Sequence, residues 1–337
     1  MKRICLLCIF SLSIAFAFSQ ERDKPQKGEG ILALLRRNNR TEAKHYDEFI
    51  RLNKDKLGKS NTLTMGTVYL LPPLATADSN KKKNTNEKKR MGTQPLFGEK
   101  YRNYEIKDNA LAGACFFLSS GHGGPDPGAI AIVDGRELHE DEYAYDITLR
   151  LARNLLEHNA TVHIIIQDSY DGIRDDMYLN NSRNETCMGK EIPLIQSERL
   201  KQRTDEINNL SFRAKEKYQR AIFIHLDSRS KTRQLDVFFV YQNVKENRDR
   251  SLKLARTMQR TFRRLYKKNQ ETRGFSGIIL TRSLYILTNT KPVSILAELA
   301  NMQNQFDQRR FLLENNRQAL ANWLCIGFIE DYQSSSR

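Results

Sequence analysis

Cysteine is scarce and unevenly placed in this 337-residue chain. The first two of its five cysteines, Cys5 and Cys8, fall in an apolar N-terminal run. The other three, Cys115, Cys187 and Cys325, are an odd number and lack C-x-x-C spacing, which argues against a disulfide framework and against a cysteine-ligated metal site. We expect Cys115 and Cys325, which lie in apolar contexts, to be small core residues.

Long apolar runs are equally rare. The only one, Ile4 to Phe18, follows a basic start and is shorter than the roughly 20 residues that span a bilayer. Ala17 and Ser19 supply the small residues that a signal peptidase requires. We therefore expect residues 1–19 to be a secretory signal that leaves no membrane-spanning segment behind. The destination, a periplasm or the cell wall and extracellular space, stays open.

Acidic residues are in deficit, with 40 Asp and Glu against 55 Lys and Arg and a formal net charge of +15. This balance favours an anionic partner such as nucleic acid, an anionic lipid surface or an acidic cell-wall polymer. The sequence carries no nucleic-acid-binding motif, and export separates the chain from nucleic acid. We therefore expect no nucleic-acid partner.

The N-terminal part predicts a small α+β module. Residues 30–37 (GILALLRR) and 46–53 (YDEFIRLN) indicate two short amphipathic helices, and 63–72 (LTMGTVYLLP) indicates a turn and a strand that ends at proline. With its Gly-x-x-Leu helix and its closing Leu-x-x-Gly-x-x-Tyr-x-Leu-Pro pattern, the segment 28–73 resembles the LysM cell-wall-binding module. The pattern for its opening strand is weak, and the segment between Asn53 and Leu63 is longer than is usual for this module. A helical prodomain without a ligand is the alternative.

The remaining chain divides into a tether and a large domain. Residues 74–108 are rich in Lys, Asn and Thr, which predicts a basic flexible linker, with contact to an anionic polymer as an alternative. Residues 109–333 alternate apolar strands with long amphipathic helices, which predicts an α/β domain with a single twisted, mostly parallel sheet flanked by helices. The expected strands are 116–119, 162–167, 221–227, 237–241, 284–287 and 294–299, and the expected helices are 142–158, a charged one within 195–218, 248–268 and 307–329.

Four polar residues stand where ligands gather in such domains, beyond the carboxyl ends of the strands. His122 follows the first strand, Glu140 immediately precedes the first helix, and His225 and Glu298 close two apolar runs. Two imidazoles and one carboxylate are the ligand set of a catalytic zinc site, whose fourth position stays open for water. A further carboxylate can accept a proton from that water and pass it to a leaving amine. The set is therefore chemically sufficient for amide hydrolysis.

Four motifs make residues 111–332 resemble the zinc-dependent N-acetylmuramoyl-L-alanine amidases, which cleave peptidoglycan between the lactyl group of muramic acid and L-alanine. They are SGHGGPDPGA at 120–129, against Gly-His-Gly-Gly-x-Asp-x-Gly-Ala; EDEYAYDI at 140–147, against Glu-Lys-Asp-x-x-Leu-x-Ile; FIHLDS at 223–228, against Ser-Ile-His-Ala-Asn; and ILAELANMQNQFD at 295–307, against Val-Glu-x-Gly-Phe-x-Ser-Asn-x-x-Asp. The resemblance implies a zinc amidase or exopeptidase-like fold. It also implies one zinc ion held by His122, Glu140 and His225, and Glu298 as general base and acid.

Further residues near these motifs are weaker candidates. Asp227 replaces the family's asparagine, and it joins Asn301, Asn304 and Arg203 as candidate substrate-binding residues; for Arg203 a structural role is equally open. Glu137 and His139 flank Glu140, but the helix phase favours Glu140 as the ligand. We expect His163 in the core, His45 and His158 on the surface, and Asp126 shaping the His122 loop. Residues 168–198 are expected to be an extra surface loop, with a lid as the alternative.

The resulting expectation is an exported zinc amidase with peptidoglycan as its partner. Two alternatives remain: a non-catalytic peptidoglycan-binding protein on an amidase scaffold, and a related zinc metallopeptidase. Nothing in the sequence fixes the oligomeric state.

Overall fold

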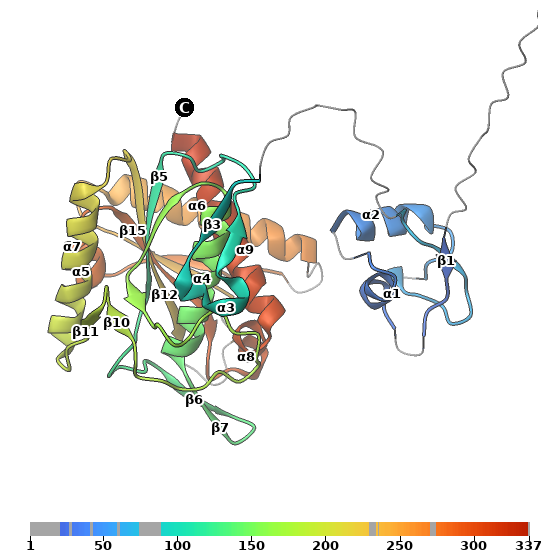
Figure 1. The fold of residues 1–337 in the computed structure, drawn as a ribbon, viewed down its shortest axis with the longest axis horizontal. Helices are drawn as coiled ribbons and strands as arrows, with labels where there is room; N and C mark the ends of the chain where they lie inside the picture. Colours follow the sequence, from blue (N-terminus) through green and yellow to red (C-terminus); the bar gives the residue numbers. More distant parts are fainter. Residues whose placement is uncertain are drawn as a thin grey trace, which may run out of the picture. The chain divides into compact units, whose positions relative to one another are not determined.

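The computed structural model of the chain forms two compact units, Met1–Glu87 and Lys88–Arg337, which are described separately (Figure 1). It describes residues 21–26, 29–40, 43–58, 61–73, 89–228, 234, 236–269 and 274–335. The expected signal segment, and residues 74–88 of the expected linker, lie outside the described residues. None of the helices that the structure describes is long and apolar enough to cross a membrane.

The N-terminal unit is a small α+β arrangement, in the order strand, helix, helix, strand. Its elements are β1 (Arg22–Asp23), α1 (Ile31–Arg37), α2 (Ala43–Leu52) and β2 (Tyr69–Leu70), with β1 and β2 antiparallel. Asn53, directly after α2, exchanges two hydrogen bonds of 2.8 Å with the backbone of Leu70 and so ties the helix end to β2. The core includes Leu34, Phe49 and Tyr69. His45, expected on the surface, is buried.

The large unit is built on a six-stranded sheet with the order β14-β13-β15-β12-β5-β8. Its strands are β5 (Ala114–Ser120), β8 (Thr161–Ile164), β12 (Tyr218–Asp227), β13 (Phe238–Tyr241), β14 (Ile278–Thr281) and β15 (Val293–Asn301). Strands β8, β5, β12 and β15 are parallel, β13 runs antiparallel to β15, and β14 is parallel to β13. The predicted mostly parallel sheet is therefore confirmed.

Helices cover both faces of this sheet, because alternate residues of each central strand point to opposite faces. Along β5, Cys115 and Phe117 join one apolar cluster, whereas Phe116 and Leu118 join the other. The first cluster is covered by α5 (Gln196–Arg213) and α7 (Tyr285–Asn289), and the second by α4 (Glu140–Glu157), α6 (Arg248–Asn269) and α9 (Glu314–Ser335) (Figure 1). The sheet is thus the middle of three layers.

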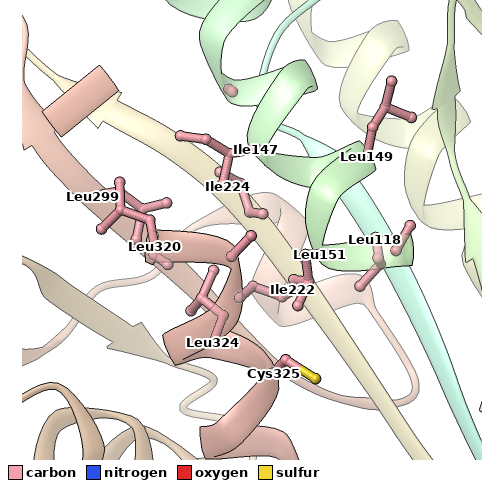
Figure 2. Close-up of a cluster of buried hydrophobic side chains, with 14 of the residues drawn as sticks. Leu118, Ile147, Leu149, Leu151, Ile222, Ile224, Leu299, Leu320, Leu324 and Cys325 are labelled. Carbon is pink, nitrogen blue, oxygen red and sulfur yellow. The ribbon is translucent and has the colours of Figure 1, made fainter. Parts of the chain in front are cut away.

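The second cluster is the larger core. Figure 2 shows Ile147 and Leu151 of α4, Ile222 of β12, and Leu320 and Leu324 of α9 among its side chains, and all five are at most 3% exposed. Each such side chain contributes about 1.5–3 kcal/mol when it leaves water. Cys325 lies in the same core, and all three cysteines of this unit are free and buried.

Short elements complete the large unit. They are β3 (Met91–Thr93), the 3₁₀ helix η2 (Pro95–Phe97), α3 (Gly98–Tyr101), β4 (Asn103–Glu105), the hairpin β6 (Ile130–Val133) and β7 (Arg136–His139), β9 (Ile166–Gln167), β10 (Thr186–Cys187), β11 (Lys190–Glu191) and α8 (Gln305–Leu312). The hairpin of β6 and β7 carries the chain from the His122 loop to the start of α4.

Several expected elements differ from the structure. Residues 284–287, expected to be a strand, are the N-cap and first residues of α7 (Tyr285–Asn289), and the sheet edge is formed by β14. The expected helix 307–329 is two helices, α8 and α9. Helix α4, expected at 142–158, begins at Glu140, which is therefore inside the helix and not before it. Residues 91–105, assigned to the linker, form structured elements around the buried Phe97. The 168–198 segment is not a simple surface loop, because β10 pairs with β9 and Asp168, Glu185, Cys187 and Ile192 are buried.

Candidate metal centre

Three of the predicted site residues converge beyond the carboxyl ends of β5 and β12. His122 lies two residues after β5, His225 lies near the end of β12, and Glu140 opens α4. One ligand atom from each lies within 4.8 Å of the other two. The two imidazole rings are perpendicular, with their centroids 4.9 Å apart. The pairing of β5 with β12 therefore places both histidines at the end of the sheet where these parallel strands terminate.

Glu140 is held by backbone donors as well as by the histidines. Its Oε1 accepts from the N–H of Leu226 at 3.0 Å and lies 2.9 Å from Nδ1 of His225. Its Oε2 accepts from the N–H of Ala129 at 2.8 Å. Burial opposes ionisation, but the hydrogen bond with His225 and the charge of His122 lower the pKa of Glu140 overall. Its place in the first turn of α4 also favours a carboxylate.

His122 is oriented by a second layer of charged residues. Its Nδ1 lies 3.0 Å from Oδ2 of Asp126, and the same oxygen accepts from the guanidinium of Arg199 at 3.0 Å. Its other nitrogen, Nε2, lies 3.5 Å from Oε2 of Glu140. A carboxylate that fixes one imidazole nitrogen directs the other to a metal ion. Asp126 thus shapes the His122 loop, as expected, through the His122 ring itself.

Two glycines of the first motif are required by space. A Cβ on Gly121 would lie 2.0 Å from the His225 ring. A Cβ on Gly128 would lie 2.7 Å from both Glu140 and His122, and its φ of +70° also favours glycine. The glycines therefore allow the loop backbone to approach the three side chains.

The predicted catalytic residue Glu298 lies beside this cluster in the sheet. In the parallel pairing of β12 with β15, Glu298 is the register partner of His225. Paired residues of neighbouring strands project from the same face. The Glu298 side chain therefore lies at the same end and on the same face of the sheet as the His225 imidazole. It is half-buried.

The weaker candidates have more varied places. Asn304 caps α8, and its side-chain oxygen accepts from Phe306 at 3.0 Å. Asn301 is fully buried and its side chain accepts from Gln303 at 3.0 Å, while Asp227 is 7% exposed and accepts from Ser228. Arg203 is buried and donates to the carbonyl oxygen of Gly121, next to His122.

The two alternative ligands beside Glu140, namely His139 and Glu137, contact each other and are not part of the cluster of His122, Glu140 and His225. His139 precedes α4 and its Nε2 lies 2.7 Å from Oε1 of the exposed Glu137. Away from the site, the half-buried His163 stacks on Phe117 of the core, and the half-buried His158 contacts Asp108 at 2.9 Å. Among the described residues, only His122, Glu140 and His225 form a group of histidine, cysteine or acidic side chains with metal-binding spacing.

The three residues fit a divalent metal ion. Burial lowers the pKa of His225, which keeps its ring neutral as metal binding requires. Glu140 is ionised, and His122 presents the nitrogen that Asp126 does not contact. Neutral imidazoles and a carboxylate are donors that divalent transition metals accept in proteins.

Sequence reasoning missed the wall beside this centre. Arg199 of α5 holds Asp126, and Leu284, Tyr285 and Ile286 at the start of α7 border a cavity that also touches His122. Arg199 and Arg203 are four residues apart on one helix, so their spacing was a signal that they share a face. The α7 residues could not be placed at this wall from the sequence, because their short apolar run is also typical of a strand.

The chain is similar to one known protein family and to several solved structures. A family model described as N-acetylmuramoyl-L-alanine amidase matches residues 117–329. Similar solved structures include the CwlD amidase of Clostridioides difficile in complex with the GerS lipoprotein (21% identity, 66% of this chain and 99% of that chain, TM-score 0.48), AmiC2 of Nostoc punctiforme (17%, 66% and 99%, 0.46) and Ami1 of Mycobacterium smegmatis (18%, 66% and 99%, 0.48). No curated protein matches the chain. Because the family match spans more than half of the sequence, the chain belongs to the N-acetylmuramoyl-L-alanine amidase family.

Proposed function

We propose that the chain is an exported, zinc-dependent N-acetylmuramoyl-L-alanine amidase, which hydrolyses the amide between the lactyl group of muramic acid and the L-alanine of peptidoglycan. The observation that carries the proposal is the cluster of His122, Glu140 and His225, with Glu298 in register beside His225. Export is supported by the apolar run after the basic N-terminus.

Zinc suits this donor set and, when bound, polarises a carbonyl group and lowers the pKa of water towards 7. The residues of the chain do the rest. His122, Glu140 and His225 hold the ion, and Asp126 keeps the His122 ring in the required orientation. Glu298 accepts a proton from the attacking water and transfers it to the amine nitrogen of the leaving alanine. The amide C–N bond breaks, and a lactyl carboxylate and a free peptide amine are formed.

A second proposal concerns the N-terminal unit, which we infer to be a LysM-like module that binds the glycan of the wall. It is supported by the resemblance of the segment 28–73 to the LysM pattern and by the strand, helix, helix, strand order of its elements. Asn53 joins the end of α2 to β2 through two hydrogen bonds with the backbone of Leu70.

The decisive experiment compares wild type with E298Q on purified peptidoglycan and on soluble muramoyl peptides. Wild type releases stem peptides with a new free alanine amine; a chelator stops the reaction and added zinc restores it. E298Q should bind zinc normally but lose about 10²–10⁴-fold in rate, because the general base is gone.

The control is E137Q, which changes an exposed carboxylate of β7 outside the cluster of His122, Glu140 and His225 and should leave the rate unchanged. Release of the same products by E298Q at a rate near that of wild type would exclude its proposed role. Cleavage of free peptides that lack muramic acid would favour a metallopeptidase, and wall binding without any product would favour a non-catalytic protein.

A further inference from the structure

A cavity of about 190 Å³ opens beside the proposed metal centre. His122 and His225 form one wall, and α5 and the start of α7 form the others. Most of its surface is apolar, from Leu200, Leu284, Ile286 and Leu296. The glycan strand is unsuited to such a wall, because sugar hydroxyl groups need many hydrogen-bond partners when they leave water.

Arg203 lines this cavity and is under-bonded. The residue is 3% exposed. One guanidinium nitrogen donates to the carbonyl oxygen of Gly121, but Nε and Nη2 have no hydrogen-bond partner among the residues that the structure describes. Burial lowers the pKa of Arg203 to about 10, so the group remains charged at neutral pH. A buried charge with unused donors is costly unless an anion meets it.

The chain does not supply that anion in the described part of the cavity wall. Its one carboxylate there, Asp126, is already shared between His122 and Arg199. Among the described residues, the Nε of Arg199 is also buried without a hydrogen-bond partner. A divalent ion held by His122, Glu140 and His225 would add further positive charge beside these two guanidiniums. A negative group of the substrate would therefore be attracted into the cavity.

We propose that this cavity is the subsite for the leaving peptide, in which Arg203 binds a carboxylate of the substrate while an aliphatic group lies on the apolar wall. The inference rests on the proposed function. The carboxylate must belong to the peptide side, because the lactyl carboxyl of the muramoyl side is neutral once it forms the amide. Because His122 and His225 line the cavity, a carboxylate bound there lies close to the cleaved bond. The predicted substrate class is a muramoyl peptide whose residue after alanine carries a free carboxylate.

The first test needs no variant. Two soluble muramoyl peptides are compared that differ only in a carboxylate or a carboxamide on the residue after alanine. Wild type should prefer the carboxylate roughly 10- to 100-fold in kcat/KM, as expected for a charge-assisted hydrogen bond in a buried site. Calorimetric titration of the two product peptides into metal-free protein should give the same preference as a difference in Kd.

The second test is R203M, with R213M as the matched control on an exposed position of the same helix. R203M should lose the carboxylate preference, mainly through KM, while R213M keeps it. Zinc content and thermal unfolding are measured for both. If R203M loses activity equally on both peptides together with zinc, Arg203 only positions the His122 loop and the proposal is wrong. A wild-type enzyme that cleaves both peptides equally well also overturns it, whereas failure to cleave either peptide contradicts the proposed function itself.

Discussion

At the scale of single residues, Asp126 connects the sequence motif to metal binding. Its carboxylate lies between the His122 ring and the Arg199 guanidinium. Burial opposes its ionisation, but the hydrogen bond and charge of His122 hold the pKa of Asp126 well below its usual range. The carboxylate is thus ionised at neutral pH, 3.0 Å from Nδ1 of His122.

The substitution D126N is predicted to weaken zinc binding about 10- to 100-fold, since residues that orient a metal-binding imidazole contribute on that scale. Competition with a chromophoric chelator measures the affinity. D134N, in the β6–β7 turn outside the site, should leave it unchanged. Equal affinities of D126N and wild type would show that the His122 ring is oriented without this carboxylate.

A second residue-scale prediction concerns Asp141, next to Glu140, the proposed metal ligand. Burial, and then the charges of Glu142 and Glu185, raise the pKa of Asp141 to about 8, from an ordinary value of 3.8. The folded protein thus keeps a proton that the unfolded chain loses near pH 4. The stability associated with this neutral form is fully present below pH 4 and is lost as the pH rises to 8.

The variant D141N keeps a neutral side chain at every pH, and its amide oxygen can still accept from the N–H of Glu142. Its free energy of unfolding should therefore exceed that of wild type by an amount that grows from pH 4 to pH 8, on the order of 1.4 kcal/mol for each unit of pKa shift. Urea unfolding of the metal-free proteins measures this difference. D249N, at an exposed position, should show no such trend.

At the scale of elements, α4 and α9 are joined by a buried charge network. Asp146 of α4 accepts from Arg150 at 2.8 Å and from Arg317 of α9 at 2.6 Å. Arg317 is fully buried and also donates to the carbonyl oxygens of Phe311 and Leu312, at the junction of α8 and α9. The network positions the helix whose first residue is Glu140.

We predict that R317M destabilises the large unit by about 3–5 kcal/mol, because it leaves buried acceptors and part of the Asp146 charge unmatched. Denaturant unfolding followed by circular dichroism measures the loss. R309M, at an exposed position of α8, should change stability by less than about 0.5 kcal/mol. A small loss in R317M would mean that water or rearranged side chains satisfy these groups.

The elements also show how far sequence reasoning reaches. Continuous apolar runs predicted β5, β12 and β15, and the glycine-flanked His122 and the strand-ending His225 could be placed at one edge because parallel strands end together. The run 284–287 was misassigned since a short apolar stretch fits a strand or a buried helix equally well. Contacts between distant charges, such as Asp146 with Arg317, leave no periodic pattern and could not be predicted. The same holds for the cavity beside His122, which is formed by five separate segments of the chain.

At the scale of the whole molecule, the division into Met1–Glu87 and Lys88–Arg337 separates wall attachment from catalysis in the proposed function. Each unit has its own apolar core. The candidate metal centre and the adjoining cavity consist of residues of the large unit alone. Catalysis should therefore not require the N-terminal unit, whereas retention on an insoluble substrate should.

A chain that begins at Lys88 is accordingly predicted to hydrolyse soluble muramoyl peptides at the wild-type rate, within about twofold. Its retention on intact peptidoglycan should fall at least about tenfold, because a second linked binding unit raises overall affinity through effective concentration. Co-sedimentation with purified walls measures retention, and release of soluble peptide measures catalysis. Equal retention of the full and shortened chains would contradict the proposed role of residues 28–73.

Salt separates this module effect from simple charge attraction. The net charge of +15 draws the chain to any anionic polymer, and this attraction weakens as the Debye length shrinks from about 10 Å at 0.1 M to about 3 Å at 1 M salt. Recognition of neutral glycan, as proposed for the N-terminal unit, would not depend on that length. The retention that the full chain has beyond the shortened one should therefore persist at 1 M salt, with E298Q used for both so that the wall stays intact. If the difference disappears at high salt, residues 1–87 act through their charge and not as a glycan-binding module.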